Sequence, residues 1–306
     1  MGTFGRKVAA WLALARLPFH SVGVLPFILG IVMAWRLERV FRLQVAAWGT
    51  LGVVLVLLAT YFAGEHWDYV EDSLAARLGP SRFAGGSRVL QRGLLPRRSA
   101  LWASLVSVGL AIGVALALHL GYETGPWTLP FAALGLAGGF FYSARPVRWV
   151  SKGVGELWIA FNYGWLPVAV GYYLQTGRIV PLVHRVAIPI GLTIFNVILL
   201  NEYPDYPADR AAGKANLLVR LGPQRAARLY ALTSAAAWAG MLLSLGQGVP
   251  GRALVVYLPI LLLSLTLVGL VTAGRWRDRG TLEKLCAANL LVNLGTTAAY
   301  LVAFAG

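Results

Sequence analysis

Residues 201–209 read Asn201-Glu202-Tyr203-Pro204-Asp205-Tyr206-Pro207-Ala208-Asp209 and directly end an uncharged, apolar run. Acidic side chains are costly beside membrane-like sequence, so their presence there indicates a function. The same spacing, Glu-x-x-Asp-x-x-x-Asp, occurs earlier in the chain at Glu65, Asp68 and Asp72. On a helix, positions i, i+3 and i+7 share one face. We therefore predict that the two acidic motifs look into one cavity.

The composition is that of a membrane protein. Of the 306 residues, 58% are hydrophobic and only 13% are charged, which is typical of polytopic membrane proteins rather than soluble domains. A net charge of +15 would suggest nucleic-acid binding in a soluble protein, but in a membrane protein basic loops hold one side in the cytoplasm. We therefore expect a lipid bilayer as partner and no nucleic acid. Cys286 is the single cysteine, which excludes an intrachain disulfide and a thiolate metal cluster.

Uncharged runs divide the sequence into candidate membrane spans. A spanning helix needs about 17–25 apolar residues, and nine runs are within or close to that length. The runs are 17–35, 43–64, 99–122, 124–144, 157–177, 186–201, 229–251, 253–274 and 285–306. We therefore predict an all-α, polytopic membrane protein of one domain, residues 1–306, with nine transmembrane helices around a central cavity open to the cytoplasmic side. The first run has no removable signal-peptide pattern and is expected to remain as an anchor.

The basic residues predict the orientation. Most of the 27 Lys and Arg residues lie in the N-terminal segment and after the second, fourth, sixth and eighth runs. Those on the other side are Arg36, Arg39, Arg42, Arg178, Arg185 and Arg252. The positive-inside rule places the N-terminus and both acidic motifs in the cytoplasm of a multi-pass cell-membrane protein, and the C-terminus on the opposite side. Residues 73–98 and 210–228 are then cytoplasmic cap loops.

The acidic motifs predict a metal site. Carboxylate clusters without His or Cys suit a hard divalent cation, here Mg²⁺ with Mn²⁺ as the alternative, and such a cation neutralises their repulsion. The predicted metal ligands are Glu65, Asp68, Asp72, Asn201, Glu202, Asp205 and Asp209, and the four aspartates are also the predicted catalytic residues. Pro204 and Pro207 each remove a helical donor, so we expect a broken helix end that lines the cavity. Two facing clusters suit a diphosphate bridged by metal to both.

Basic and aromatic residues on the same side complete the candidate site. The predicted diphosphate-binding residues are Lys152, Lys214, Arg145, Arg148 and Arg88, each of which has a simple topology charge as its alternative interpretation. The predicted acceptor or prenyl pocket contains Tyr142, Glu156 and Asn162. An aromatic face stabilises a cation, whereas packing or helix capping is the alternative for these three residues.

These motifs resemble those of the UbiA superfamily of intramembrane prenyltransferases. Its members carry Asn-Asp-x-x-Asp-x-x-x-Asp after helix 2, a Tyr-containing basic stretch after helix 4 and a second Asp-rich motif after helix 6. The corresponding stretches here are 64–72, 142–146 and 201–209, so the resemblance covers nearly the whole chain. Two residues depart from the pattern, since Gly64 replaces the usual Asn and Glu65 replaces the usual Asp. Glu65 could still ligate a metal, whereas Gly64 has no side chain with which to do so.

Residues 83–90 and 213–222 are similar to the branch that contains the 1,4-dihydroxy-2-naphthoate prenyltransferases of menaquinone biosynthesis. The resemblance implies Mg²⁺-dependent transfer of a polyprenyl group from a polyprenyl diphosphate to a small aromatic acceptor, which we expect to be 1,4-dihydroxy-2-naphthoate. Other reactions of the superfamily remain open: transfer to 4-hydroxybenzoate, homogentisate, a porphyrin alcohol or a phosphosugar, or terpene cyclisation. An alternative from a different class is a transporter of divalent cations or organic anions.

Overall fold

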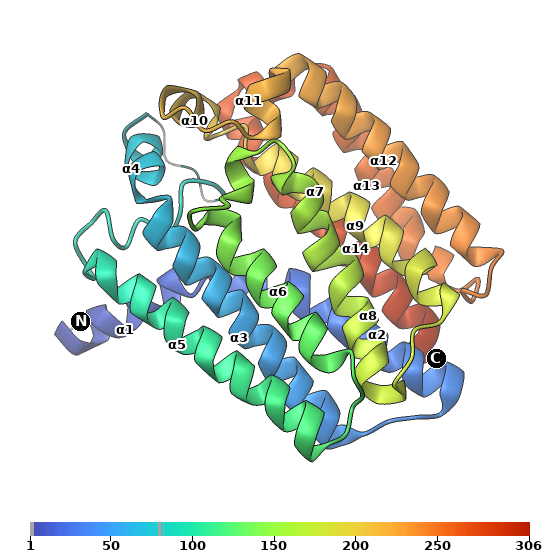
Figure 1. Cartoon of the computed structure of the whole chain (residues 1–306). Helices are drawn as coiled ribbons and strands as arrows, with labels where there is room; N and C mark the ends of the chain where they lie inside the picture. Colours follow the sequence, from blue (N-terminus) through green and yellow to red (C-terminus); the bar gives the residue numbers. More distant parts are fainter. Residues whose placement is uncertain (1–2, 79–80, 82) are drawn as a thin grey trace.

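All regular elements in residues 3–78, 81 and 83–306, the part of the chain that the computed structural model describes, are helices (Figure 1). The prediction of an all-α protein is therefore confirmed. The α-helices are α1 (Thr3–Leu14), α2 (Ser21–Glu38), α3 (Leu43–Trp67), α4 (Tyr69–Leu78), α5 (Arg97–Leu116), α6 (Thr128–Ser143), α7 (Gly155–Ala160), α8 (Leu166–Thr176), α9 (Pro181–Asn201), α10 (Tyr206–Ala211), α11 (Leu217–Leu221), α12 (Pro223–Leu245), α13 (Ala253–Thr272) and α14 (Arg279–Ala305). The 3₁₀ or π segments are η1 (Leu17–His20), η2 (Ala117–Gly121), η3 (Trp149–Ser151), η4 (Phe161–Trp165) and η5 (Arg275–Arg277).

Within the described residues, six helical segments are long and apolar enough to cross a membrane. They are Phe4–Glu38, Leu43–Trp67, Arg97–Gly121, Pro181–Asn201, Ala253–Thr272 and Arg279–Ala305. All nine predicted runs fall on helices, but nine membrane-spanning helices are not confirmed. Helix α6 is apolar but has only 16 residues, and the fifth run is divided among α7, η4 and α8. Helix α12 is less apolar because it opens with Arg225 and Arg228 and is rich in alanine.

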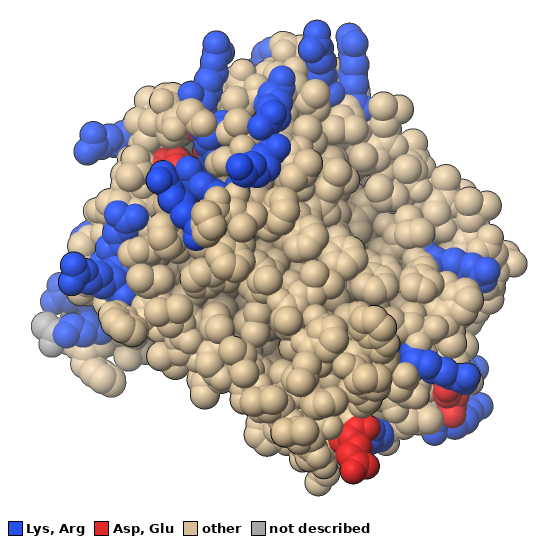
Figure 2. Space-filling view, in the orientation of Figure 1, with Lys and Arg blue, Asp and Glu red and all other residues tan. Residues whose placement is uncertain are grey.

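Charged side chains are distributed unevenly over the molecule. Lys and Arg gather around the end that carries α4, α10 and α11, while the middle of the molecule is almost free of charge (Figures 1 and 2). A smaller charged group, which includes carboxylates, lies at the opposite end (Figure 2). The uncharged band is what a bilayer requires, because a charge at membrane depth is expensive. Which end faces the cytoplasm stays a prediction from the positive-inside rule.

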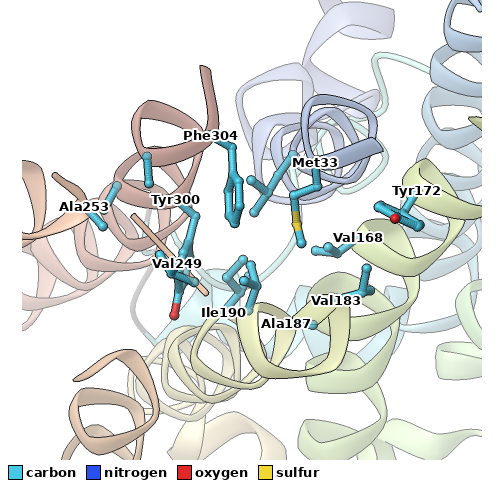
Figure 3. Packing of buried hydrophobic residues seen from close by; sticks show 14 of the residues in the cluster. Met33, Val168, Tyr172, Val183, Ala187, Ile190, Val249, Ala253, Tyr300 and Phe304 are labelled. Atoms are coloured by element: carbon cyan, nitrogen blue, oxygen red, sulfur yellow. The ribbon is translucent and has the colours of Figure 1, made fainter. Parts of the chain in front are cut away.

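A dense core holds the helices together away from the acidic motifs. Figure 3 shows Met33, Val168, Ile190 and Phe304 meeting from α2, α8, α9 and α14. Ile190 lies three turns before the end of α9 at Asn201, so this cluster forms a packed base for the helices that reach the motifs.

Two glycines allow helices α2 and α8 to approach closely in this core. A Cβ at Gly30 would collide with the backbone oxygen of Val168, and a Cβ at Gly171 would collide with that of Phe27. Small residues permit such close packing of helices in membrane proteins. The base of the bundle therefore tolerates no side chain at these two positions without moving a helix.

Both acidic motifs lie where a long helix ends. Helix α3 ends at Trp67, and after Asp68 the chain continues as α4. Helix α9 ends at Asn201, and a turn leads to α10, which begins at Tyr206 with a proline in its first turn. The predicted broken helix end is therefore confirmed. Helices α4 and α10 contact each other, so the two breaks meet at one end of the bundle (Figure 1).

Residues 73–98 and 210–228, predicted as cap loops, are partly helical. The first segment contains the end of α4 and the start of α5, and the second contains α11 and the first turns of α12. Residues 79, 80 and 82 of the first segment lie outside the described residues. Whether the two segments form a cap on the cytoplasmic side remains a proposal.

Candidate active site

The first acidic motif is held in place by neighbouring loops. Glu65, buried at the end of α3, accepts hydrogen bonds from the backbone N–H of Ser87 at 2.6 Å and from its Oγ at 2.9 Å. Asp68 accepts a hydrogen bond of 2.5 Å from Ser143 Oγ at the end of α6, and Arg148 lies 3.5 Å from its other oxygen. Arg148 also pairs with Glu71. The motif is thus fixed by residues from three separate segments.

The second acidic motif is fixed in a comparable way. Asp205 Oδ2 accepts a hydrogen bond of 2.7 Å from the backbone N–H of Gly85. Asp209, which is 2% exposed, accepts a hydrogen bond of 2.8 Å from Asn216 Nδ2 and lies 3.3 Å from Lys214 Nζ. Carboxylates held by backbone and side-chain donors are pre-oriented, as a binding site requires.

One cavity, here called the site cavity, brings the two motifs together. Its empty space, which includes the part open to solvent, is about 1160 Å³. Its lining includes all seven predicted metal ligands, Glu65, Asp68, Asp72, Asn201, Glu202, Asp205 and Asp209, together with Lys214, Tyr142 and Arg16. The two acidic motifs therefore line one cavity, as the sequence predicts.

The loop 83–88, part of the predicted cap loop 73–98, connects the two motifs. Gly85 binds Asp205 of the second motif, and two residues later Ser87 binds Glu65 of the first. Gly85 and Gly86 both have positive φ angles, of 72° and 64°. The Gly-Gly pair within 83–90 was the signal in the sequence, because glycine adopts this conformation at little cost and exposes its backbone N–H.

A side chain at Gly86 of this loop should disturb the site sterically. The same substitution at Gly93 serves as a matched control. Gly86→Ala would place a Cβ against Asp72 Oδ2, whereas Gly93→Ala, at a similar φ of 67°, meets nothing within 4 Å. Both variants should lose about 1–2 kcal/mol of stability from the left-handed backbone. Only Gly86→Ala should also lose catalytic efficiency, by about 10²-fold, because it displaces a carboxylate. Thermal melting and kcat/KM of both variants test this, and equal losses of activity would contradict it.

The buried carboxylates of the site cavity repel one another, and a bound cation would relieve this repulsion. Burial, with the nearby charge of Asp209, raises the pKa of Asp205 to about 6. Burial and the charges of Asp68 and Glu65 raise the pKa of Asp72 well above its ordinary value. Burial alone would lower the pKa of Lys214, but the charges of Asp209 and Asp68 raise it. The carboxylates thus repel one another, and Lys214 offsets only part of that repulsion.

These residues fit a hard divalent cation. Every predicted ligand offers oxygen, and the buried Oδ1 of Asn201 has no hydrogen-bond partner. No three Asp, Glu, His or Cys side chains in the described parts of the chain already form a cluster that could hold a metal by itself. Mg²⁺ typically takes one or two carboxylates and completes its shell with water and phosphate oxygens. The spread of the carboxylates around the cavity therefore agrees with a metal shared between protein and diphosphate.

The predicted diphosphate-binding residues separate into two groups. Lys214 lines the site cavity, and Arg148 is tied to the first motif through Asp68 and Glu71. Neither Arg148 nor the other three residues line the cavity. Arg145 and Lys152 are exposed, and the guanidinium of Arg88 donates to the backbone oxygen of Ser81. For these three residues, contact with diphosphate remains a prediction.

The structure does not bring the three predicted pocket residues together in one pocket. They are Tyr142, Glu156 and Asn162. Tyr142 lines the site cavity. Glu156, 1% exposed, uses Oε1 to accept a hydrogen bond of 2.8 Å from the N–H of Leu217 at the start of α11, while its Oε2 has no partner. Asn162 lines a second, apolar cavity and donates to the backbone oxygen of Trp158 at 2.9 Å.

Glu202 has a contact that its place in the motif does not suggest. It accepts a hydrogen bond of 3.4 Å from the N–H of Leu218, so Glu156 and Glu202 both bind the first turn of α11. Burial and the neighbouring charge of Glu156 raise the pKa of Glu202 well above its ordinary value. Glu202 thus helps to position the segment that carries Lys214.

Comparison with known proteins agrees with this geometry. Residues 23–295 match the UbiA prenyltransferase family. The chain is 28% identical over 233 residues to the 1,4-dihydroxy-2-naphthoate octaprenyltransferase of Escherichia coli, covering 74% of this chain and 72% of that protein. It is 25% identical over 219 residues to the enzyme of the same name from Bacillus subtilis, covering 71% and 68%.

Solved structures share the fold. A UbiA homologue from Aeropyrum pernix K1 superposes with a TM-score of 0.66 at 19% identity, over 92% of this chain and 97% of that one. A UbiA homologue from Archaeoglobus fulgidus, solved with DMAPP and Mg²⁺, superposes with a TM-score of 0.65 at 17% identity, over 95% and 98%. The sequence match extends over most of the chain and includes both acidic motifs. The chain therefore belongs to the UbiA prenyltransferase family and is a membrane-embedded transferase.

Proposed function

We propose that this prenyltransferase transfers a polyprenyl group from a polyprenyl diphosphate to 1,4-dihydroxy-2-naphthoate, a step of menaquinone biosynthesis, and that it requires Mg²⁺. The observation that carries the proposal is the convergence of two carboxylate motifs and Lys214 on one cavity. The acceptor is suggested by the names of the relatives from Escherichia coli and Bacillus subtilis. The metal is suggested by the donor set and by the Mg²⁺ in the Archaeoglobus fulgidus homologue.

The metal would be held by the oxygen ligands that face the cavity. Asp68 and Asp72 offer carboxylates from the first motif, and Asn201, Asp205 and Asp209 offer oxygens from the second. Glu65 and Glu202 line the same cavity, and their carboxylates, like that of Asp205, also accept backbone hydrogen bonds. When bound, a divalent cation supplies positive charge that stabilises the oxygens of the leaving diphosphate.

Lys214 is positioned to bind the diphosphate itself. Lys214 lines the cavity, its side chain is 12% exposed, and its Nζ lies 3.3 Å from Asp209 Oδ1. A cation fixed in a cavity of low dielectric opposes developing negative charge more strongly than one in water. Arg148 keeps Asp68 in place, and Arg88, Arg145 and Lys152 would meet the diphosphate only from outside the cavity lining.

The apolar part of the cavity would receive the reacting carbon. As the carbon–oxygen bond of the diphosphate breaks, its electron pair leaves with the diphosphate and the prenyl carbon becomes cationic. Tyr61, Tyr142 and Tyr163 line the cavity, and aromatic faces stabilise a cation without capturing it. The electron-rich ring of the acceptor then supplies the pair for the new carbon–carbon bond, and the ring regains its aromaticity by losing the group that the prenylated carbon carried, either a proton or, at the carboxylated carbon, carbon dioxide. Exclusion of water from this wall would protect the cation from hydrolysis.

Mass spectrometry of the products tests the proposal. The purified protein in lipid nanodiscs would receive Mg²⁺, a long or short prenyl diphosphate and a panel of aromatic acceptors. We expect a prenylated naphthoate product that disappears when EDTA removes the metal. A product with another acceptor alone would assign the chain to a different reaction of the family. Metal flux across proteoliposomes without any prenylated product would favour the transporter instead.

A further inference from the structure

The first helix, α1, is not needed to cross the membrane. It precedes α2 in an apolar stretch of 35 residues, Phe4–Glu38, which as one straight helix would be about 52 Å long, whereas the hydrocarbon core is about 30 Å thick. Arg16, with a left-handed φ of 50°, breaks the stretch after α1. The 18 residues of α2 are enough for one span. Helix α1 is therefore left for the interface between hydrocarbon and water.

Two faces of α1 are apolar, and the protein covers one of them. Ala10 and Leu14 lie on the covered face. They share a buried cluster with Phe62, Val89, Leu90 and Leu95. Phe4, Val8 and Leu12 follow one another at intervals of four residues, so they align along a second face. Their side chains are 80%, 42% and 54% exposed. This second face would be stable only against an apolar layer.

The surface around α1 is basic and contains no acid. Neither residues 1–37 nor residues 73–122 include Asp or Glu. Arg6 and Lys7 on α1 are exposed, as are Arg92 and Arg98 beside the start of α5, and none of the four forms an ion pair with another described residue. Lys and Arg without Asp or Glu surround the position of α1 in the view of Figure 2 (Figures 1 and 2). A partner of this surface must combine negative charge with an apolar layer.

The loop that packs against α1 continues directly into the candidate active site. Val89 belongs to the cluster that covers Ala10 and Leu14. Two residues earlier, the backbone N–H of Ser87 binds Glu65 at 2.6 Å. Gly85 of the same loop, as described above, binds the second motif. Helix α1 is thus the outer support of the loop that joins the two acidic motifs.

We propose that α1 and the start of α5 form a binding surface for anionic phospholipid headgroups, and that lipid bound there steadies the loop 83–88. Phe4, Val8 and Leu12 enter the apolar layer just below the headgroups, as the apolar face of an interfacial helix does. The basic residues meet the headgroup phosphates, because clusters of Lys and Arg at a bilayer surface attract anionic lipid. A zwitterionic bilayer offers the apolar layer without net negative charge, so anionic lipid is the preferred partner.

The depth of α1 in a bilayer tests the contact with lipid. A nitroxide is attached to Leu12→Cys in nanodiscs of phosphatidylcholine and phosphatidylglycerol, and Cys286, the only native thiol, is buried. Ala13→Cys is the matched control, since Ala13 is also exposed but shares the face of Arg6, seven residues earlier. We expect relaxation by oxygen to dominate at position 12 and relaxation by a water-soluble nickel complex at position 13. Equal accessibility of the two labels, or a label at position 12 in water, would overturn the contact.

Removal of the basic residues tests the preference for anionic lipid. Arg6→Gln/Lys7→Gln takes two charges from α1, and Arg36→Gln/Arg39→Gln, at exposed positions on the opposite side, is the matched control. Native mass spectrometry of protein released from the mixed nanodiscs counts the retained lipids. We expect the ratio of phosphatidylglycerol to phosphatidylcholine to fall at least about fivefold in the α1 variant alone. The same ratio in the wild type and both variants would overturn the preference.

Hydrogen–deuterium exchange tests the effect on the loop. In the wild type, peptides covering 83–95 should exchange several-fold more slowly when phosphatidylglycerol is present than in phosphatidylcholine alone, because the supported loop opens less often. The control variant should respond like the wild type, whereas Arg6→Gln/Lys7→Gln should exchange equally fast in both lipids. Wild-type exchange that is independent of phosphatidylglycerol would overturn the steadying of the loop. None of these measurements requires turnover, so an error in the proposed function leaves them unaffected.

Discussion

Asp205→Asn lowers the Mg²⁺-dependent rate of prenyl transfer by about 10²–10³-fold, because it removes a negative charge from the carboxylates that would hold the metal. The change keeps the shape of the side chain and an oxygen that can accept the hydrogen bond from the N–H of Gly85. The fold should therefore survive, and the melting temperature should change little. The measurement is kcat/KM as a function of Mg²⁺ concentration, with product detected by mass spectrometry.

A carboxylate elsewhere in the chain serves as the control for Asp205. Glu123 is exposed in the segment between η2 and α6 and does not line the site cavity. Glu123→Gln removes the same charge and should retain wild-type kinetics. If Asp205→Asn also retained its activity at low Mg²⁺, the assignment of the second motif as a metal site would be wrong.

Lys214→Met should impair both the stability and the donor binding of the protein. The substitution keeps an unbranched side chain of similar length but leaves Asp209, which is 2% exposed, without its ion-pair partner. Removing one member of a buried pair costs about 3–5 kcal/mol, because the remaining charge stays buried. We also expect a rise in KM for the prenyl diphosphate, since a cation at the cavity wall is lost. Thermal melting and steady-state kinetics measure the two effects.

The double variant separates these two effects of Lys214. In Lys214→Met/Asp209→Asn the buried carboxylate is neutral, so most of the lost stability should return. Donor binding should remain weak, because the cation is still absent. Lys284→Met, at an exposed position on α14, is the matched control and should change neither quantity. An unchanged KM in Lys214→Met would exclude a direct contact between this lysine and the diphosphate.

Much of the architecture could be predicted from the sequence. The nine uncharged runs all fall on helices, because a bilayer admits only segments whose backbone groups are satisfied internally. The helix break after Asn201 was predictable from Pro204 and Pro207, which cannot donate backbone hydrogen bonds. The number of spans was less certain, because α6 is short and the segment from Gly155 to Thr176 contains a π-helical section. Length and hydropathy alone do not resolve such helices.

The site was predictable where the residues repeat and unpredictable where they do not. Six of the seven candidate ligands share a repeated spacing, and all seven line one cavity. Gly85, Ser87, Ser143 and Asn216, which hold the carboxylates in place, carry no spacing signal because each comes from a different segment. For the basic residues, closeness to the motifs in the predicted topology did not indicate which of them line the cavity. Arg145 and Lys152 lie near the motifs in topology but not in the cavity wall.

The sequence by itself determined that this chain is a helical membrane protein with two acidic motifs on one side, and it pointed to the family. Those properties follow from local periodicity and charge, which act over a few turns of helix. Only the tertiary structure decided that loop 83–88 joins the motifs 201–209 and 65–72. It alone placed an apolar cavity among α3, α5, α6 and α8. Cavities are spaces between segments far apart in the chain, and their shape depends on how side chains pack around them.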